Sequence, residues 1–243
     1  MNPDSWAEAE QILDSISEYF RTASDQEQSL VVCPPFVFVE EVSKLLQTSS
    51  LGQHVELGAQ DIALTDQGSL TGEISGTMLT KLGTRYVIIG HSERRWKLGE
   101  GNEVVNQKLK AALQSELVPI VCVGERERDE NYKEFLKQQI EATFADLSAD
   151  DVAKCLVAYE PVWAISSNPN AQPDTPESTL ESVAVIKDFL NTKHKIQDTR
   201  ILYGGSVKAQ NAKDFLSLDE LSGVLVGGAS LRKEEFVQIL KQV

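Results

Sequence analysis

Short runs of apolar, largely β-branched residues recur along the chain and predict seven strands. The runs are nearly continuous rather than alternating, which is typical of strands covered on both faces, as in a parallel sheet. They lie at residues 29–38, 55–61, 85–92, 118–125, 154–161, 200–206 and 223–228.

Amphipathic helical patterns separate most of these runs. In residues 5–20 apolar side chains recur at helical spacing from Trp6 to Phe20, and Ser5 with Glu8 can form a capping box. Similar patterns occupy residues 103–115, 132–145, 177–193 and 231–242. Alternating strands and helices predict βαβ crossovers, hence either a doubly wound open sheet or a closed eight-fold barrel. No linker or compositional break interrupts the pattern, so we expect one domain over residues 1–243.

The composition describes an acidic globular protein. Of 243 residues, 23 are Lys or Arg and 37 are Asp or Glu, a formal net charge of −14, and 41% are hydrophobic, which is too apolar for a disordered chain. A surface this acidic, with no basic stripe, argues against nucleic-acid binding. No apolar run approaches the ~20 residues of a bilayer span, and no signal-peptide pattern occurs. We therefore expect no membrane partner and a cytoplasmic location.

The cysteines and histidines give no indication of a metal site. The cysteines Cys33, Cys122 and Cys155 are odd in number and lie in apolar runs, which predicts buried free thiols rather than disulfides. The three histidines form no ligand spacing such as HExxH. We expect no metal ion.

Polar or glycine-rich segments end six of the seven runs. These segments are GAQD, GHSERR, VGE, AYEP, YGGS and VGGAS. In a βα barrel the C-terminal ends of the strands converge on one rim, where catalytic loops lie. Because packing alone does not explain polar residues there, this rim is the predicted functional edge.

Two strand ends carry candidate catalytic side chains. Glu160 follows the apolar segment CLVAY, and partial desolvation raises a carboxyl pKa toward the range of a general base. His91 follows YVIIG; if Ser92 caps a helix beginning at Glu93, the positive helix end keeps the imidazole neutral, able to donate a hydrogen bond to an enolate oxygen. Taken singly, such residues more often have structural roles, as an ion-paired glutamate or a histidine bonded to backbone.

Two glycine-rich turns follow the last two predicted strands. They are GGS at 204–206 and GGAS at 227–230, and the second leads into a helix predicted to start near Leu231. Glycines let backbone N–H groups approach a phosphate, and a helix dipole adds attraction. One such turn is common in any fold, whereas two after the last two strands match the phosphate site of a barrel.

Taken together, these segments resemble the triosephosphate isomerase family. The matching strings are CPPF at 33–36, GAQD at 58–61, LTGEIS at 70–75, IIGHSERR at 88–95, CVGE at 122–125, AYEPVWAI at 158–165, LYGGSV at 202–207 and LVGGASL at 225–231. They occur in family order and at family spacing across nearly the whole chain. The resemblance implies an eight-stranded barrel, usually dimeric, that interconverts dihydroxyacetone phosphate and glyceraldehyde 3-phosphate without a cofactor.

The resemblance also implies residue roles by position. Glu160 would be the base that moves the proton and His91 the neutral electrophile, a pairing for which this family is itself the standard example, and Glu93 would belong to the same catalytic set. The backbone N–H groups that bind the substrate phosphate would be those of Ser166, Ser206, Gly227 and Gly228.

A lid and a subunit contact follow from the same resemblance. The lid would be residues 161–171, with Glu125, Trp163, Tyr203 and Ala171 as its hinge and latch residues. Thr71, in the loop 62–75, would reach into a partner's active site. The implied partners are a small phosphorylated triose and a second copy of the chain, in a homodimer or another homo-oligomer.

The chain departs from the family at its start. The family's first strand ends in Asn, and a catalytic Lys follows after one residue; here Met1 comes directly after the place of that Lys. We therefore expect an α/β barrel of the TIM (β/α)8 type that lacks its first β-strand, with seven strands and two open sheet edges that something must cover. A gene start assigned at an internal methionine, loss of the strand in the lineage and deliberate truncation all fit this start.

The missing lysine also affects the expected activity. A preorganised charge of this kind is worth ~3–4 kcal/mol, or about 10²–10³ in rate, so weak turnover is expected. The alternative is a catalytically silent barrel that binds a phosphorylated sugar or has a structural role. Another phosphate-binding barrel enzyme would require His91 and Glu160 to match by accident.

The lid sequence departs as well. Residues 166–169 read SSNP where the family has Gly-Thr-Gly-Lys, and about three extra residues, Gln172 to Asp174, precede Thr175. Replacing glycines restricts positive φ, and Pro169 removes a donor. Altered lid closure is therefore expected.

Overall fold

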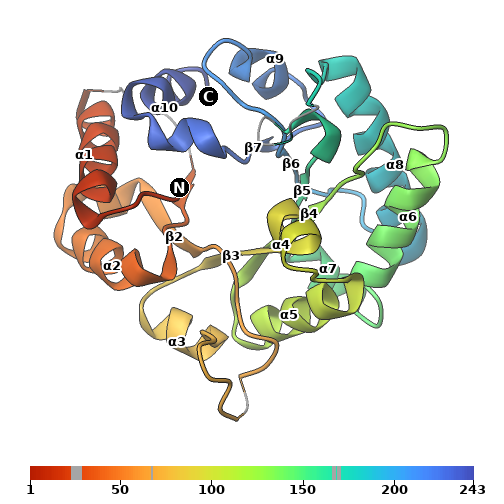
Figure 1. The fold of residues 1–243 in the computed structure, drawn as a ribbon, viewed down its shortest axis with the longest axis horizontal. Coiled ribbons are helices and arrows are strands. Elements are labelled where there is room, and N and C mark those ends of the chain that lie inside the picture. The colour runs from red at the N-terminus through yellow and green to blue at the C-terminus, as the bar shows by residue number, and fades with distance from the viewer. Residues whose placement is uncertain (23–28, 67, 166–167, 169–170) are drawn as a thin grey trace.

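The computed structural model of the chain describes residues 1–22, 29–66, 68–165, 168 and 171–243. Seven parallel strands form one sheet in sequence order, as predicted, and it curls with helices around its outside (Figure 1). The strands are β1 (Leu30–Val32), β2 (Val55–Ala59), β3 (Tyr86–Ile89), β4 (Val118–Val123), β5 (Leu156–Tyr159), β6 (Ile201–Tyr203) and β7 (Gly223–Val224).

Helices follow most strands, and four of them match the predicted ranges closely. The α-helices are α1 (Trp6–Thr22), α2 (Val39–Thr48), α3 (Gly76–Lys81), α4 (Ser92–Lys97), α5 (Asn102–Gln114), α6 (Tyr132–Thr143), α7 (Ala149–Ala153), α8 (Pro176–His194), α9 (Ala212–Leu216) and α10 (Lys233–Leu240). Short 3-10 helices are η1 (Phe36–Phe38), η2 (Ser50–Gln53), η3 (Val162–Ala164) and η4 (Gly228–Leu231). Within the described ranges, none of the helices is long and apolar enough to cross a membrane.

The strands are buried on both faces, which explains their continuous apolar runs. In β4, Ile120 and Cys122 belong to a small inner cluster with Ala158 of β5, whereas Val121 and Val123 belong to the large cluster between sheet and helices. Successive residues of a strand point to opposite faces, so both faces must be apolar. Residues within the strands are therefore buried away from any substrate. Residues at the C-terminal ends of the strands are the ones that can take part in catalysis.

Several predicted boundaries are wrong: the run 223–228 is a strand only at Gly223–Val224, and three others differ for a local reason. The run 29–38 is a strand only to Val32, because the prolines that follow cannot donate to a sheet ladder. The helix expected at Leu231 begins at Lys233, after η4 and an extended Arg232. The helix α4 is capped by His91 rather than by Ser92, which is its first residue.

The start of α1 follows the predicted capping pattern with a shift of one residue. The Glu8 N–H donates to Ser5 Oγ at 3.2 Å, as in a capping box. The Glu8 carboxylate accepts from the Asp4 N–H at 2.9 Å rather than from Ser5. Both contacts satisfy N–H groups at the helix end.

The sheet has two edges, β1 and β7, which do not pair with each other within the described structure. Helices α1 and α10 pack side by side outside this gap, and the chain begins inside the curl (Figure 1). The Gln60 Nε2 donates to the Met1 carbonyl at 2.6 Å and to the Cys33 carbonyl at 3.0 Å. Helices and the first residues therefore partly cover the two edges, as the sequence required.

One hydrogen bond joins the two helices across the gap. The buried Tyr19 hydroxyl of α1 donates to the Leu240 carbonyl of α10 at 3.1 Å. Tyr19→Phe is expected to lower the free energy of unfolding by about 1 kcal/mol, because the carbonyl loses a buried partner. Tyr86→Phe, at a half-buried tyrosine on β3, is the matched control, with an expected change below about 0.5 kcal/mol. Equal values for the two variants in urea denaturation would show that the bond adds nothing.

Candidate active site

A cavity of about 630 Å³ opens at the C-terminal ends of the strands. His91 after β3 and Glu160 after β5 line it, together with the glycine turns 204–206 after β6 and 227–228 after β7. The structure thus brings the four strongest sequence candidates into one cavity. Parallel strands converge their carboxyl ends on one rim, which is why residues so distant in sequence meet.

Glu160 is seated by two glycines and is almost fully buried, with 2% of its surface exposed. A Cβ at Gly124 would fall 1.7 Å from the Glu160 carbonyl oxygen, and one at Gly204 would fall 2.9 Å from its Cγ. Its Oε2 accepts from the Ser92 N–H at 2.8 Å, and its Oε1 lies 3.1 Å from His91 Nε2. The carboxylate therefore faces the cavity at a set distance from the imidazole.

His91 is held by the helix that it caps. Its Nδ1 accepts from the Glu93 N–H at 3.3 Å, so that nitrogen carries no proton and the neutral ring is protonated on Nε2. This differs from the sequence prediction, in which Ser92 was the cap. The His91 Nε2 lies 3.1 Å from Glu160 Oε1, but Oε1 accepts no hydrogen bond within the described residues, so a substrate oxygen could take this donor.

Cys122 is a site residue that sequence reasoning treated only as a buried thiol. All three cysteines are buried and free, as predicted, and the Cys122 thiol lies close enough to the Glu160 carboxylate to favour its charged form. The buried Arg95 also donates to the Cys122 carbonyl at 3.1 Å. The alternation of side chains in β4 could have indicated an inward-facing thiol, but not its partner on β5.

The pKa of Glu160 is raised from its ordinary value, chiefly by burial. His91, the Ser92 N–H and the Cys122 thiol each oppose this shift by favouring the charged form. A base works only when ionised, so its activity falls when the pH drops below this raised pKa. Because the folded state holds this proton more tightly, the group stabilises the fold below its unfolded pKa of about 4.3, and that stability is lost as the pH rises through the raised value.

Cys122→Ala is expected to move the acidic limb of the kcat/KM profile upward by about 0.5–1 pH unit. The variant removes a donor that favours the ionised form of Glu160, so the pKa of Glu160 rises further. Cys122→Ser retains a donor and should leave the limb near its original place. Cys155→Ala removes an equally buried thiol, which bonds the Asp151 carbonyl, and should not move the limb. An unmoved limb in Cys122→Ala would show that the thiol does not tune Glu160.

The two glycine turns present backbone donors to the cavity. Gly227 and Gly228 are exposed, and within the described residues the Gly227 N–H donates no hydrogen bond. The Ser206 carbonyl is fixed by the Asn211 side chain at 2.9 Å, and the Gly227 carbonyl by the Ser230 hydroxyl at 2.7 Å. Because the N–H and C=O of one peptide point in opposite directions, the inward Gly227 carbonyl leaves the Gly228 N–H directed toward the cavity, as an anion site requires.

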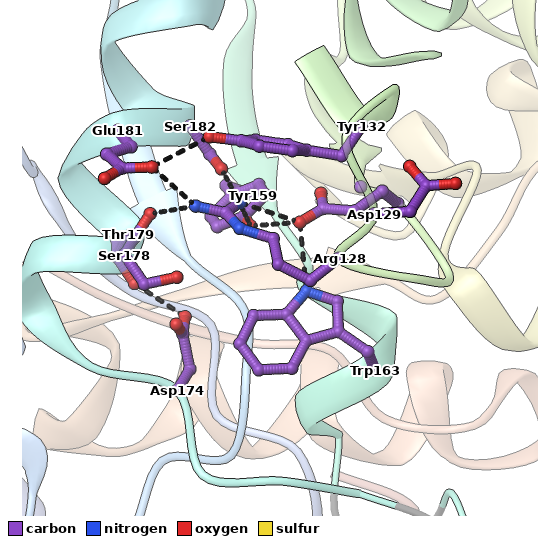
Figure 2. A network of polar contacts seen from close by, with 12 residues as sticks. Arg128, Asp129, Tyr132, Tyr159, Trp163, Asp174, Ser178, Thr179, Glu181 and Ser182 are labelled. Carbon is purple, nitrogen blue, oxygen red and sulfur yellow. Dashed lines mark hydrogen bonds and ion pairs between the residues drawn. The ribbon is translucent and has the colours of Figure 1, made fainter.

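A polar network lies below the predicted lid. The buried Glu125 carboxylate accepts from the Tyr159 hydroxyl at 2.8 Å, from Trp163 Nε1 at 2.9 Å and from Arg128 Nη1 at 3.0 Å. Figure 2 shows Arg128, Tyr159 and Trp163 converging on this point, with the Arg128 guanidinium also over the Tyr132 ring at 3.7 Å. The geometry is that of a rigid support beneath residues 161–165.

Among the predicted latch residues, Tyr203 lies beside Asp174. Burial and this carboxylate raise the pKa of the Tyr203 hydroxyl. The Asp174 carboxylate accepts from the Thr179 hydroxyl at 2.7 Å (Figure 2). The Ala171 N–H donates instead to the Asn168 carbonyl at 3.0 Å. Asp174 belongs to the extra residues of this lid, and its Tyr203 contact could not be read from spacing. Ser166 lies outside the described residues.

Thr71 is exposed at a turn of the loop between β2 and α3, which projects from the body of the protein in Figure 1. An exposed position in a projecting loop suits a contact with another molecule. For metals, a search of the described residues finds no group of three or more His, Cys, Asp or Glu side chains able to hold an ion.

Comparison with known proteins gives a consistent result over the whole chain. A family model described as triosephosphate isomerase matches residues 1–243. A triosephosphate isomerase of Caldanaerobacter subterraneus subsp. tengcongensis is 41% identical over 229 residues, 93% of this chain and 90% of that protein. One from Herminiimonas arsenicoxydans is 40% identical over 99% of this chain and 95% of its own length.

A solved structure gives the same result for the fold. The crystal structure of triosephosphate isomerase from Bartonella henselae is similar with a TM-score of 0.79 and 32% sequence identity. The match covers 97% of this chain and 91% of that one.

Proposed function

The chain belongs to the triosephosphate isomerase family, and from that premise we propose that Glu160 and His91 carry out the isomerisation of dihydroxyacetone phosphate and glyceraldehyde 3-phosphate. The family's enzymes are aldose–ketose isomerases, so the reaction class follows from membership. The observation that supports these residue roles is the 3.1 Å separation of Glu160 Oε1 and His91 Nε2 in the cavity lined by both glycine turns.

The proposed reaction moves one proton between adjacent carbons. The Glu160 carboxylate takes a proton from the carbon beside the substrate carbonyl, and the C–H electron pair forms the C=C bond of an enediolate. The His91 Nε2–H stabilises the oxygen on which negative charge develops, while Glu93 holds Nδ1 through its backbone N–H. The hydroxyl oxygen of the enediolate gives its proton to the other oxygen, through His91 Nε2, as Glu160 returns its proton to the neighbouring carbon, so atoms and charge balance.

The substrate phosphate would be held by backbone donors. Ser206, Gly227 and Gly228 line the cavity with Glu160, and Ser166 would add the fourth N–H from the lid. Trp163 and Glu125 would brace the lid hinge, while Tyr203 and Ala171 would take part in its latch. Closure of such a lid excludes water from the enediolate.

A coupled assay tests this proposal. The 243-residue chain should convert glyceraldehyde 3-phosphate, and its kcat/KM should fall at acidic pH as Glu160 becomes protonated. Phosphoglycolate should inhibit the reaction competitively. Phosphoglycolate binding without any turnover would instead support the alternative of a catalytically silent sugar-phosphate-binding barrel.

We propose further that turnover by this chain is impaired. A preparation of residues 1–243 alone does not include the family's first-strand Asn and Lys, and without that ammonium its rate should be about 10²–10³ lower. A kcat/KM equal to that of a family member with the lysine would contradict this part of the proposal.

The remaining parts of the proposal concern organisation. Residues 1–243 would form one barrel domain that acts in the cytoplasm, in glycolysis and gluconeogenesis. The exposed loop around Thr71, which also carries the exposed Leu70, supports a homodimer or another homo-oligomer. Light scattering should give a mass above that of one chain, and Thr71→Arg should shift it toward one chain.

A further inference from the structure

The basic side chains that line the cavity are few in this acidic protein. Within the described residues they are Arg94, Lys97, Lys208 and Arg232. The substrate of the proposed function carries a phosphate at one end and develops enediolate charge at the other. Each basic side chain can therefore be assigned to the phosphate end or the reacting end of the substrate, from its place in the cavity and from the carboxylates that it contacts.

Arg94 is already engaged by buried carboxylates. Its Nη2 lies 2.8 Å from Asp61 and 2.6 Å from Glu100, and Lys108 contacts the same two carboxylates at 2.6 and 2.7 Å. Separating buried charges from their partners is expensive, so Arg94 stays in this cluster.

Two other cations lie at the phosphate end. Lys208 comes two residues after Ser206, and Arg232 comes four residues after Gly228. Arg232 is ion-paired with Glu235, three residues further along the chain. Neither residue comes from the part of the chain around His91.

Lys97 lies at the reacting end of the cavity. It is the last residue of α4, the helix that His91 caps, and its Nζ is 2.7 Å from Glu93 Oε1. The other Glu93 oxygen lies 3.9 Å from His91 Nδ1. The Lys97 and Glu93 side chains are 62% and 54% exposed, so solvent screens their pairing and makes it weak. The ammonium can therefore exchange Glu93 for another anion at little cost.

We propose that Lys97 supplies the ammonium that meets the reacting end of the substrate, an inference that rests on the proposed isomerase function. Its four-carbon side chain carries three donors and can turn from Glu93 toward the oxygen atom that His91 also faces. A charge-assisted hydrogen bond to this oxygen strengthens as negative charge develops there. Lys97 thus places a cation beside Glu93 and His91 at the reacting end of the cavity.

Binding of two ligands to the full chain tests the inference. Phosphoglycolate carries a carboxylate at the position of the enediolate oxygens, whereas inorganic phosphate needs only the glycine turns. By calorimetry, Lys97→Met should weaken phosphoglycolate about 10-fold to 100-fold and change phosphate affinity less than about 2-fold. Lys97→Arg, which retains the charge, should keep most of the phosphoglycolate affinity.

Lys44→Met is the matched control. Lys44 forms the same i,i+4 pair with Glu40, at 2.6 Å on α2, and neither residue lines the cavity. It should leave both affinities unchanged. Phosphoglycolate affinity of Lys97→Met within about 2-fold of the original chain would overturn the inference, as would equal losses for both ligands. A different result would contradict the proposed function: the original chain would bind phosphoglycolate but would not isomerise glyceraldehyde 3-phosphate.

Discussion

Glu160→Gln is expected to lower kcat for glyceraldehyde 3-phosphate by about 10³-fold to 10⁴-fold, because the amide cannot accept the proton that isomerisation moves. The substitution preserves shape. The side-chain oxygen can still accept from the Ser92 N–H, which lies 2.8 Å from Oε2. The lost activity would therefore result from the missing proton acceptor and not from a disrupted site.

Stability and binding provide the controls for this variant. Burial raises the pKa of Glu160, so its ionised form is unfavourable in the fold, and the neutral amide should not lower the free energy of unfolding. Inorganic phosphate affinity should also be unchanged. Glu125→Gln replaces an equally buried carboxylate at the end of β4; it should disturb the hinge but reduce kcat far less. A kcat for Glu160→Gln within 10-fold of the original would remove Glu160 as the base.

Adding the family's first strand with its Asn-x-Lys ahead of Met1 is expected to raise kcat/KM by about 10²-fold to 10³-fold. The strand would lie between β7 and β1, which are unpaired edges in the described sheet, and the lysine would bring a preorganised ammonium to the cavity. The same added strand with Met in place of Lys is the matched control. It should raise stability by pairing both edges while leaving kcat/KM nearly unchanged.

The two versions of the added strand separate closure of the sheet from electrostatics. Equal rate gains with Lys and with Met would show that pairing of the edges, not charge, limits turnover. The variant with the added lysine also allows a second test of the role of Lys97. If both ammonium groups serve the same oxygen, Lys97→Met should matter less when the added lysine is present, a coupling that a double-mutant cycle measures.

The strands and most helices could be predicted from the sequence because their signals are local. Continuous apolar runs mark strands buried on both faces, and period-3.6 patterns mark the long helices α1, α5, α6 and α8. The rim could be predicted too, because polar residues at strand ends, such as Glu160 and His91, have no packing reason to be there. Errors came where a short local signal competed, as with the prolines after Val32 and the extended Arg232 before α10.

The sequence by itself determined the fold class, the family and the candidacy of His91, Glu160 and the two glycine turns, since each depends on residue type and order along one strand or turn. Only the tertiary structure decided their partners: the Cys122 thiol on Glu160, Asp174 on Tyr203, and Lys97 beside the reacting end. The first two contacts join segments about 30 to 40 residues apart, and Lys97 reaches the cavity only because α4 begins at His91. Such contacts depend on how neighbouring strands align and how loops pack, and no local propensity encodes that alignment.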